Sequence, residues 1–225
     1  MDHLEKELKK EFQLERMILF TDAVFAIAIT LLAIEIKVPE IHSLHAGETI
    51  DSAIGTHLLD MTPKFIGFFV SFFVIGQYWT VHHRLFGYLT DYSTKLLWAN
   101  ILYLLGIVLL PFSSAFYSDY AVMGAKLPFG FYLGNIIFLG IMNARLWRII
   151  AEPKNKLSKL DRKTMFVKFY VTRSYMVPSA FLLAFIGSFI WSWLSVILLT
   201  LMPFYGFLIK KYFKQKYGFE PERRY

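Results

Sequence analysis

The sequence predicts an all-α integral membrane protein with six membrane-spanning helices. Hydrophobic residues make up 56% of its 225 residues and charged residues only 18%, whereas about a quarter of the residues in a soluble domain are charged. The apolar residues form blocks of about 20, the length that an α-helix needs to cross a hydrocarbon core of about 30 Å. The chain has no cysteine, which excludes disulfides, thiolate metal sites and cysteine nucleophiles.

The blocks are predicted to form a single domain over residues 1–225. The first block follows the charged, helix-forming segment MDHLEKELKKEFQLER, and no small-residue cleavage site follows the block, so we expect this span to be retained. The polar connection after it carries Pro39, Gly47 and Pro63, with a short amphipathic helix expected over Ile50–Met61. The last two spans are expected to form a tight hairpin near Gly187–Trp193. The predicted spans are 16–38, 64–86, 95–117, 127–150, 168–189 and 192–212.

The distribution of lysine and arginine predicts the orientation of these spans. If both termini are cytoplasmic, that side holds 20 of the 24 lysine and arginine residues. The opposite side holds three, Lys37, Lys64 and Lys126, and Arg173 lies within the fifth span. This bias favours cytoplasmic termini in a multi-pass protein of the cell membrane. The basic surplus therefore indicates contact with anionic membrane lipids and no nucleic-acid partner.

The first span, RMILFTDAVFAIAITLLAIEIKV, contains an aspartate among apolar residues. On a helical wheel Arg16, Ala23, Ile27, Thr30 and Ile34 share one stripe, with Leu31 and Val38 at its edge, whereas Asp22 points in a different direction. An ionisable group in a span faces protein or water rather than lipid. Asp22 could bind a proton or cation, but the two alanines of its stripe, Ala26 and Ala33, favour a hydrogen-bond acceptor between packed helices.

Polar residues in the later spans favour hydrogen bonds between packed helices over a metal-binding or catalytic role. His82 and His83 are adjacent and point about 100° apart, so they cannot form an i, i+4 metal pair. One of them is expected to hydrogen-bond within the bundle, with Asp22 as a candidate partner. Asn100 needs an interhelical partner, and Pro111 should kink the third span. Asn135, Asn143 and Arg173 have no obvious partner.

Enzymatic function is not indicated. The sequence has no glycine-rich phosphate loop, no GxSxG motif and no pair of carboxylates at helical spacing within a span. No metal-ligand spacing is present, and no cofactor is expected. A potassium filter of the TVGYG type is also absent.

The segment RMILFTDAVFAIAITLL resembles the first-helix signature of the transmembrane protein 175 family, which includes the endolysosomal potassium channel and prokaryotic relatives. The signature Arg-x-x-x-Phe-Ser-Asp reads Arg16, Phe20, Thr21 and Asp22 here, and threonine keeps the serine hydroxyl. YWTVHHRLF and LLWANILYLLGIVLLPF resemble the family's second and third helices. The resemblance covers about the first half of the chain and is that of a prokaryotic member with one six-helix unit.

The resemblance implies a homotetrameric, potassium-preferring cation channel whose first helix lines a central pore. It implies a hydrophobic constriction at Ile27, a polar layer at Thr30, and further pore lining at Leu31 and Ile34. Permeant potassium and other monovalent cations are the implied partners, with no bound metal besides the permeant ion. The residues implied to hold the pore helix in a packing network are Arg16, Phe20, Thr21, Asp22, His82 or His83, Trp98 and Asn100.

Two rival functions are kept beside the channel. A proton- or cation-coupled secondary transporter would use Asp22 as its coupling group, although the two halves of the chain show no convincing internal repeat. A membrane-embedded interaction protein would have no role in permeation.

Overall fold

The computed structural model describes residues 3–40, 48–120 and 123–219. Within these ranges the chain is built from α-helices and one short 3₁₀ turn, with an isolated bridge between Leu89 and Ser158 as the only strand-like pairing. The elements in chain order are α1 His3–Ile34, α2 Ile50–Asp60, α3 Thr62–Phe86, α4 Thr94–Tyr120, α5 Lys126–Ile150, η1 Pro153–Asn155, α6 Met165–Arg173, α7 Met176–Ile190, α8 Ser192–Thr200 and α9 Met202–Tyr217.

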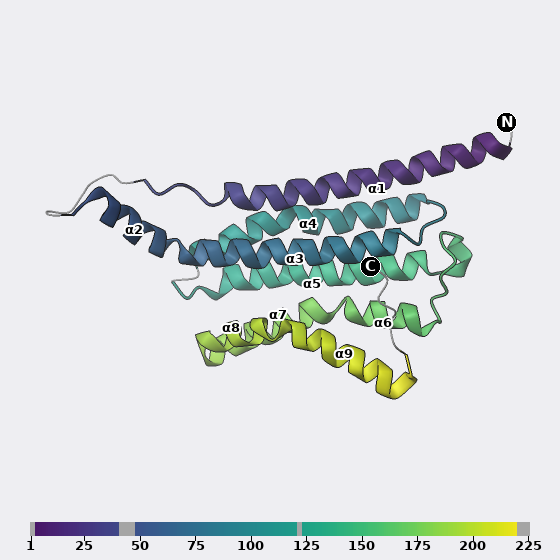
Figure 1. The fold of residues 1–225 in the computed structure, drawn as a ribbon. Coiled ribbons are helices and arrows are strands. Elements are labelled where there is room, and N and C mark those ends of the chain that lie inside the picture. Colours follow the sequence, from purple (N-terminus) through teal and green to yellow (C-terminus); the bar gives the residue numbers. More distant parts are fainter. Residues whose placement is uncertain (1–2, 41–47, 121–122, 220–225) are drawn as a thin grey trace.

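Five helical segments among the described residues are long and apolar enough to cross a membrane. They are Glu7–Ile34, Thr62–Phe86, Thr94–Tyr120, Lys126–Ile150 and Met165–Ile190. Each contains most or all of one of the first five predicted spans. The all-helical membrane class is therefore confirmed. The charged N-terminal segment is continuous with the first span in α1 (Figure 1).

The predicted sixth span, 192–212, differs from the structure because it is not one helix. It is divided into α8, with nine residues, and α9, with 16 residues, and each is shorter than the roughly 20 residues that a straight crossing needs. Leu201 separates the two helices, and a proline occupies the first turn of α9. Proline has no backbone N–H and its ring obstructs the preceding turn, which explains the interruption.

Two shorter predictions are confirmed. The connection after α1 contains α2, whose first turn is capped by the Thr49 hydroxyl accepting a hydrogen bond from the Ser52 amide at 3.2 Å. The hairpin between the last apolar segments is formed by α7 and α8, which join at Trp191 in an extended conformation.

The fifth predicted span is also interrupted, between α6 and α7 at Ser174 and Tyr175. Pro178 follows in the first turn of α7 and cannot donate to the Ser174 carbonyl. Helix α5 lies close to this break at Gly140, where an added Cβ would be 3.0 Å from the Ser174 carbonyl oxygen. Gly140 therefore allows α5 and α7 to approach each other closely.

Helix α4 lies at the centre of the packing. It contacts α1, α3 and α5, which run alongside it in Figure 1, while α7 joins the C-terminal helices to α5. The N-terminal part of α1 extends beyond the other helices (Figure 1), and Lys10 forms an ion pair with Asp91 of the α3–α4 connection at 3.3 Å. The fully buried side chains of the core include Ile75, Leu96, Tyr103, Ile107, Leu110, Ile136 and Leu139.

Two asparagines without a predicted partner stabilise the interior. The Asn135 amide donates to the Gly106 carbonyl at 3.1 Å, near Pro111, which α4 contains without ending. Asn143 donates to the Ser174 hydroxyl at 2.9 Å, beside the break between α6 and α7. Among the described residues, Arg173 Nε is buried without a hydrogen-bond partner.

Candidate pore-lining face of α1 and its supporting network

One face of α1 is buried against its own subunit. Met17, Thr21, Phe25, Ala28 and Leu32 recur at intervals of four or three residues and all have almost no exposed surface; Phe25 is 1% exposed. This spacing places them on one side of a helix. The face packs against α3 and α4, and the Phe25 ring lies 5.8 Å from His82 and 6.1 Å from Tyr103, measured between centroids.

The predicted pore-lining residues lie on the opposite face. Ile27 is 58% exposed and Ile34 is 70% exposed, and Thr30 and Leu31 are exposed as well. On a helical wheel this stripe is centred about 130° from the buried face. In the described part of the subunit Ile27 and Ile34 therefore remain largely uncovered, and Thr30 and Leu31 partly so, at the edge of the bundle where Figure 1 shows α1.

The Thr30 hydroxyl already donates its proton in a hydrogen bond within α1. Its Oγ1 donates to the Ile27 carbonyl oxygen at 2.8 Å within the same helix. The lone pairs of Oγ1 remain available to a donor or a cation outside the helix. Thr30 thus provides an oxygen ligand between the aliphatic side chains of Ile27 and Ile34.

A buried polar chain connects α1 with α3 and α4. The Thr21 hydroxyl donates to the Met17 carbonyl at 2.8 Å and accepts from the Asn100 amide at 2.8 Å. Asn100 Oδ1 lies 2.9 Å from His82 Nε2. An amide oxygen can only accept, so Nε2 carries the proton and every group in this chain has a compatible role.

Aromatic side chains enclose His82. Its ring is stacked on Tyr103 at 5.3 Å with an interplanar angle of 16°, and the Phe86 ring lies 3.8 Å away. The imidazole is 2% exposed. It is held in one orientation by these rings and by Asn100, which fixes its place between α3 and α4.

Asp22 has a different partner from the one predicted. Its Oδ1 accepts a hydrogen bond from Trp79 Nε1 at 2.9 Å, and Trp79 is stacked on His83 at 5.3 Å. The prediction that one of the two histidines hydrogen-bonds within the bundle is confirmed by His82, but its partner is Asn100 and not the candidate Asp22. Trp79 was missed because it reads as an interfacial anchor in the sequence.

Three predicted network members lie outside these hydrogen-bonded groups. Arg16 is exposed, with its guanidinium 5.6 Å from the Phe12 ring centroid on the same helix. Phe20 is also exposed, and Trp98 is 61% exposed. In the described subunit their side chains leave α1 and α4 on uncovered sides, so their part in the packing network stays a prediction.

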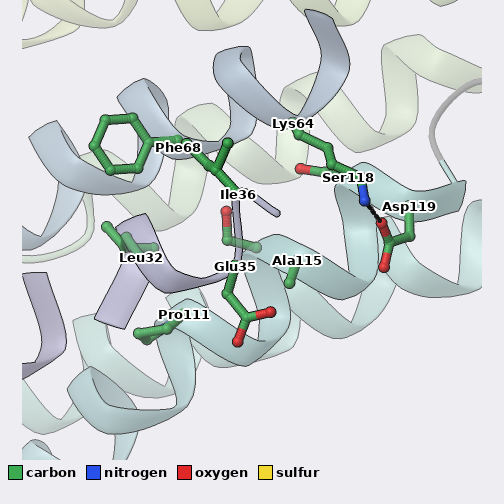
Figure 2. Close-up of a pocket in the computed structure, with 10 residues that line it drawn as sticks. Leu32, Glu35, Ile36, Lys64, Phe68, Pro111, Ala115, Ser118 and Asp119 are labelled. Atoms are coloured by element: carbon green, nitrogen blue, oxygen red, sulfur yellow. Dashed lines mark ion pairs between the residues drawn. The ribbon is translucent and has the colours of Figure 1, made fainter. Parts of the chain in front are cut away.

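A small cavity lies where α1 ends, next to the start of α3 and the end of α4. Figure 2 shows Leu32, Glu35, Lys64, Pro111 and Asp119 around it, with Lys64 paired to Asp119 at 2.9 Å. The ion pair fixes the ends of α3 and α4 to each other. Glu35 is exposed at this end of the Ile27 stripe.

The described residues contain no cluster of three or more histidine, aspartate or glutamate side chains able to hold a metal ion. What the site offers is an aliphatic stripe with one oxygen layer and a rigid support behind it. This arrangement suits contact with a hydrated ion in passage or with further copies of the chain, rather than bond-making chemistry.

Comparison with known proteins shows to which family the chain belongs. The family model described as endosomal/lysosomal potassium channel TMEM175 matches residues 16–111, from Arg16 to Pro111. A potassium channel from Chamaesiphon minutus is 34% identical over 193 residues, which cover 84% of this chain and 91% of the relative. The chain belongs to the TMEM175 family.

The TMEM175 relationship extends to the fold. The crystal structure of a lysosomal potassium-selective channel TMEM175 homolog from Chamaesiphon minutus matches with a TM-score of 0.68 and 28% identity, covering 88% of this chain and 98% of that one. A Gallus gallus protein named endosomal/lysosomal proton channel TMEM175 is 34% identical over 117 residues, which cover 51% of this chain and 23% of that protein.

Proposed function

We propose that this TMEM175-family chain is the subunit of a potassium-preferring cation channel in which α1 lines the pore. The observation that carries the proposal is the stripe of Ile27, Thr30, Leu31 and Ile34, which lies opposite the buried face of α1 and is left uncovered by its own subunit. The relatives named potassium channels support potassium as the permeant ion.

Four copies of the chain would enclose the pathway. A closed ring brings the same face of each copy to a central axis, so one exposed stripe per subunit suffices to line a pore. The number four is the one implied by the resemblance to prokaryotic TMEM175 members. Arg16, Phe20 and Trp98, which are exposed in one subunit, would then be available to neighbouring copies.

Ile27 would form the constriction. A ring of isoleucine side chains offers an ion no ligand to replace its hydration water. When the ring is narrow, water leaves the constriction and hydrated ions cannot pass. The Thr30 oxygens, about one helical turn further on, would replace part of the hydration shell. Leu31 and Ile34 would continue the lining. Selectivity would come from partial dehydration rather than from a backbone-carbonyl filter.

The charges at the two ends support an orientation with both termini in the cytoplasm of a cell that carries the channel in its cell membrane. The segments 145–168 and 210–216 are basic, and cytoplasmic loops carry such an excess. On the opposite side Glu35, Asp51 and Asp60 are exposed. They would raise the local concentration of cations at the outer entrance.

Electrical recording from purified protein in planar bilayers tests the proposal. Under a potassium gradient at equal pH, we expect currents whose reversal potential follows the potassium equilibrium potential, and a native mass of four chains. Currents that follow a pH gradient alone would make protons the permeant ion. Flux that requires a counter-ion and saturates as an exchange would establish the transporter and refute the channel.

A further inference from the structure

A cleft separate from the α1 face opens where α5 ends, between α6 and α9. Its volume is about 570 Å³. The ends of these three helices lie at the same end of the molecule as the N-terminal part of α1 (Figure 1). The connection after α5 is held against that helix because the Arg162 amide donates to the Ala151 carbonyl at 2.8 Å. The cleft is therefore bounded by fixed elements rather than by a free loop.

The rim of the cleft is basic. Arg148 belongs to the last turn of α5, Arg162 to the connection, and Lys168 to α6. Glu152 pairs with Arg162 at 3.4 Å, whereas Arg148 and Lys168 have no ion pair with any described carboxylate. Three cations thus face one carboxylate, and two of the cations are free to bind an anion.

The floor of the cleft is apolar. Val167 and Phe213 are almost fully buried there, and Met165 and Val171 continue the surface. Phe213 is held in place by Phe169, with ring centroids 5.2 Å apart and planes at 85°. A basic rim above an apolar floor matches a molecule with an anionic group attached to hydrocarbon.

Phenol groups complete the opening on the α9 side. Tyr212 and Tyr217 line the cleft, and Lys216 donates to the Tyr212 hydroxyl at 2.7 Å while its ammonium lies 5.5 Å from the Tyr217 ring centroid. Tyrosines with one apolar side and one hydroxyl are typical of the membrane–water interface. This composition places the opening at headgroup depth.

From these observations we infer that the cleft binds the phosphate headgroup of an anionic phospholipid, with Arg148 and Lys168 contacting the phosphate and the partly exposed Met165 and Val171 the adjoining hydrocarbon. A lipid fits better than a soluble phosphate compound because the floor is apolar and because α6 begins the membrane-crossing segment Met165–Ile190. The site is distinct from the α1 face, and its occupancy can be measured without ion flux.

The test is a native mass spectrometry titration of the full chain, in uncharged detergent, with phosphatidylglycerol. Phosphatidylcholine serves as the lipid without net charge, and glycerol phosphate as the soluble headgroup. The double variant Arg148→Gln/Lys168→Gln is compared with Lys154→Gln/Lys159→Gln, which removes the same charge from exposed positions outside the cleft. Thermal unfolding without lipid checks that both variants are folded.

We expect the wild type to bind phosphatidylglycerol in preference to both other ligands. The double cleft variant should bind it about 30-fold more weakly and each single variant about fivefold more weakly, from the usual contribution of a basic side chain near anionic lipid. The control variant should keep the wild-type affinity within about twofold. If one cleft variant does not fold, the remaining single variant carries the comparison.

If phosphatidylglycerol binding were weakened equally in the cleft and control variants, the cleft would be refuted as the binding site. The lipid would then be attracted by the overall positive charge at this end of the molecule. Equal binding of phosphatidylcholine would overturn recognition of the anionic group. If glycerol phosphate bound as tightly as phosphatidylglycerol, the ligand of the cleft would be a soluble phosphate compound and not a lipid.

Discussion

The two faces of α1 have nearly opposite surroundings although both consist mainly of aliphatic residues. Phe25, Ala28 and Leu32 are covered by α3 and α4, and Thr21 is tied to Asn100. Ile27, Leu31 and Ile34 lack cover from their own subunit. Hydrophobicity therefore does not distinguish the core of this helix from its proposed pore face. The polar residues do: both threonine hydroxyls donate to a carbonyl of α1, but only the buried Thr21 also accepts a hydrogen bond from another helix.

Four substitutions can break or sharpen this contrast, and their expected effects on stability fall in the order given. The largest is expected for Phe25→Ala, which leaves a cavity where the ring meets His82 and Tyr103. The loss should be about 3–5 kcal/mol, visible as a lower thermal unfolding midpoint in detergent. Leu105→Ala, at an exposed position of α4, is the control. Equal losses in both would contradict a special role for the buried face.

Asn100→Leu should rank second. It keeps the volume but removes the acceptor of His82 Nε2–H, while the Thr21 hydroxyl loses its donor Asn100 and keeps its own hydrogen bond to the Met17 carbonyl. The expected cost is about 1–3 kcal/mol for each group left unsatisfied. Adding Thr21→Val and His82→Phe removes these groups, and part of the stability should return. Full additivity of the three losses would show that the residues do not act as one network.

Asp22→Asn is expected to be milder. The amide oxygen can still accept from Trp79 Nε1, but a neutral acceptor forms a weaker hydrogen bond, so about 1 kcal/mol should be lost. Conductance of the folded channel should change little. Abolished flux in a stable protein would make Asp22 an ion-coupling group and revive the transporter.

Ile27→Asn should change stability least, by less than about 0.5 kcal/mol in the subunit, since the side chain is 58% exposed. Its effect should appear in single-channel conductance, which we expect to rise because an amide keeps the constriction wet. Leu19→Asn is the matched control, exposed on the same helix outside the predicted lining. Unchanged conductance in the Ile27 variant alone would remove Ile27 as the constriction.

The sequence was enough to predict the helical membrane class, α2, and the separation of Asp22 from Ile27 on α1. These follow from length, composition and helical periodicity, which are local properties. It did not identify the face of α1 that meets its neighbours: Ala26 and Ala33, expected at a helix contact, are exposed in the described subunit, because in a membrane helix both buried and exposed faces are apolar. The choice between His82 and His83 likewise depends on where Asn100 of another helix lies.

The breaks in the C-terminal half were harder to predict. A run such as 192–212 has the length of one span, and hydropathy does not register that a proline near its middle divides it into α8 and α9. Trp79 was missed for a related reason. Its amphipathic ring is equally compatible with the membrane interface and with a hydrogen bond to Asp22, and only the packing of α3 against α1 selects the second.

The unbroken course of α1 has a mechanical consequence. Its 32 residues correspond to about 48 Å of helix without a hinge. Lys10, paired with Asp91, lies about 26 Å along the axis from Ile27. A tilt of about 5° pivoting at Lys10 would shift Ile27 by about 2 Å at that length, more than the radius of a water molecule. Because the helix is unbroken, a tilt of α1 would be transmitted to Ile27 rather than absorbed by a hinge.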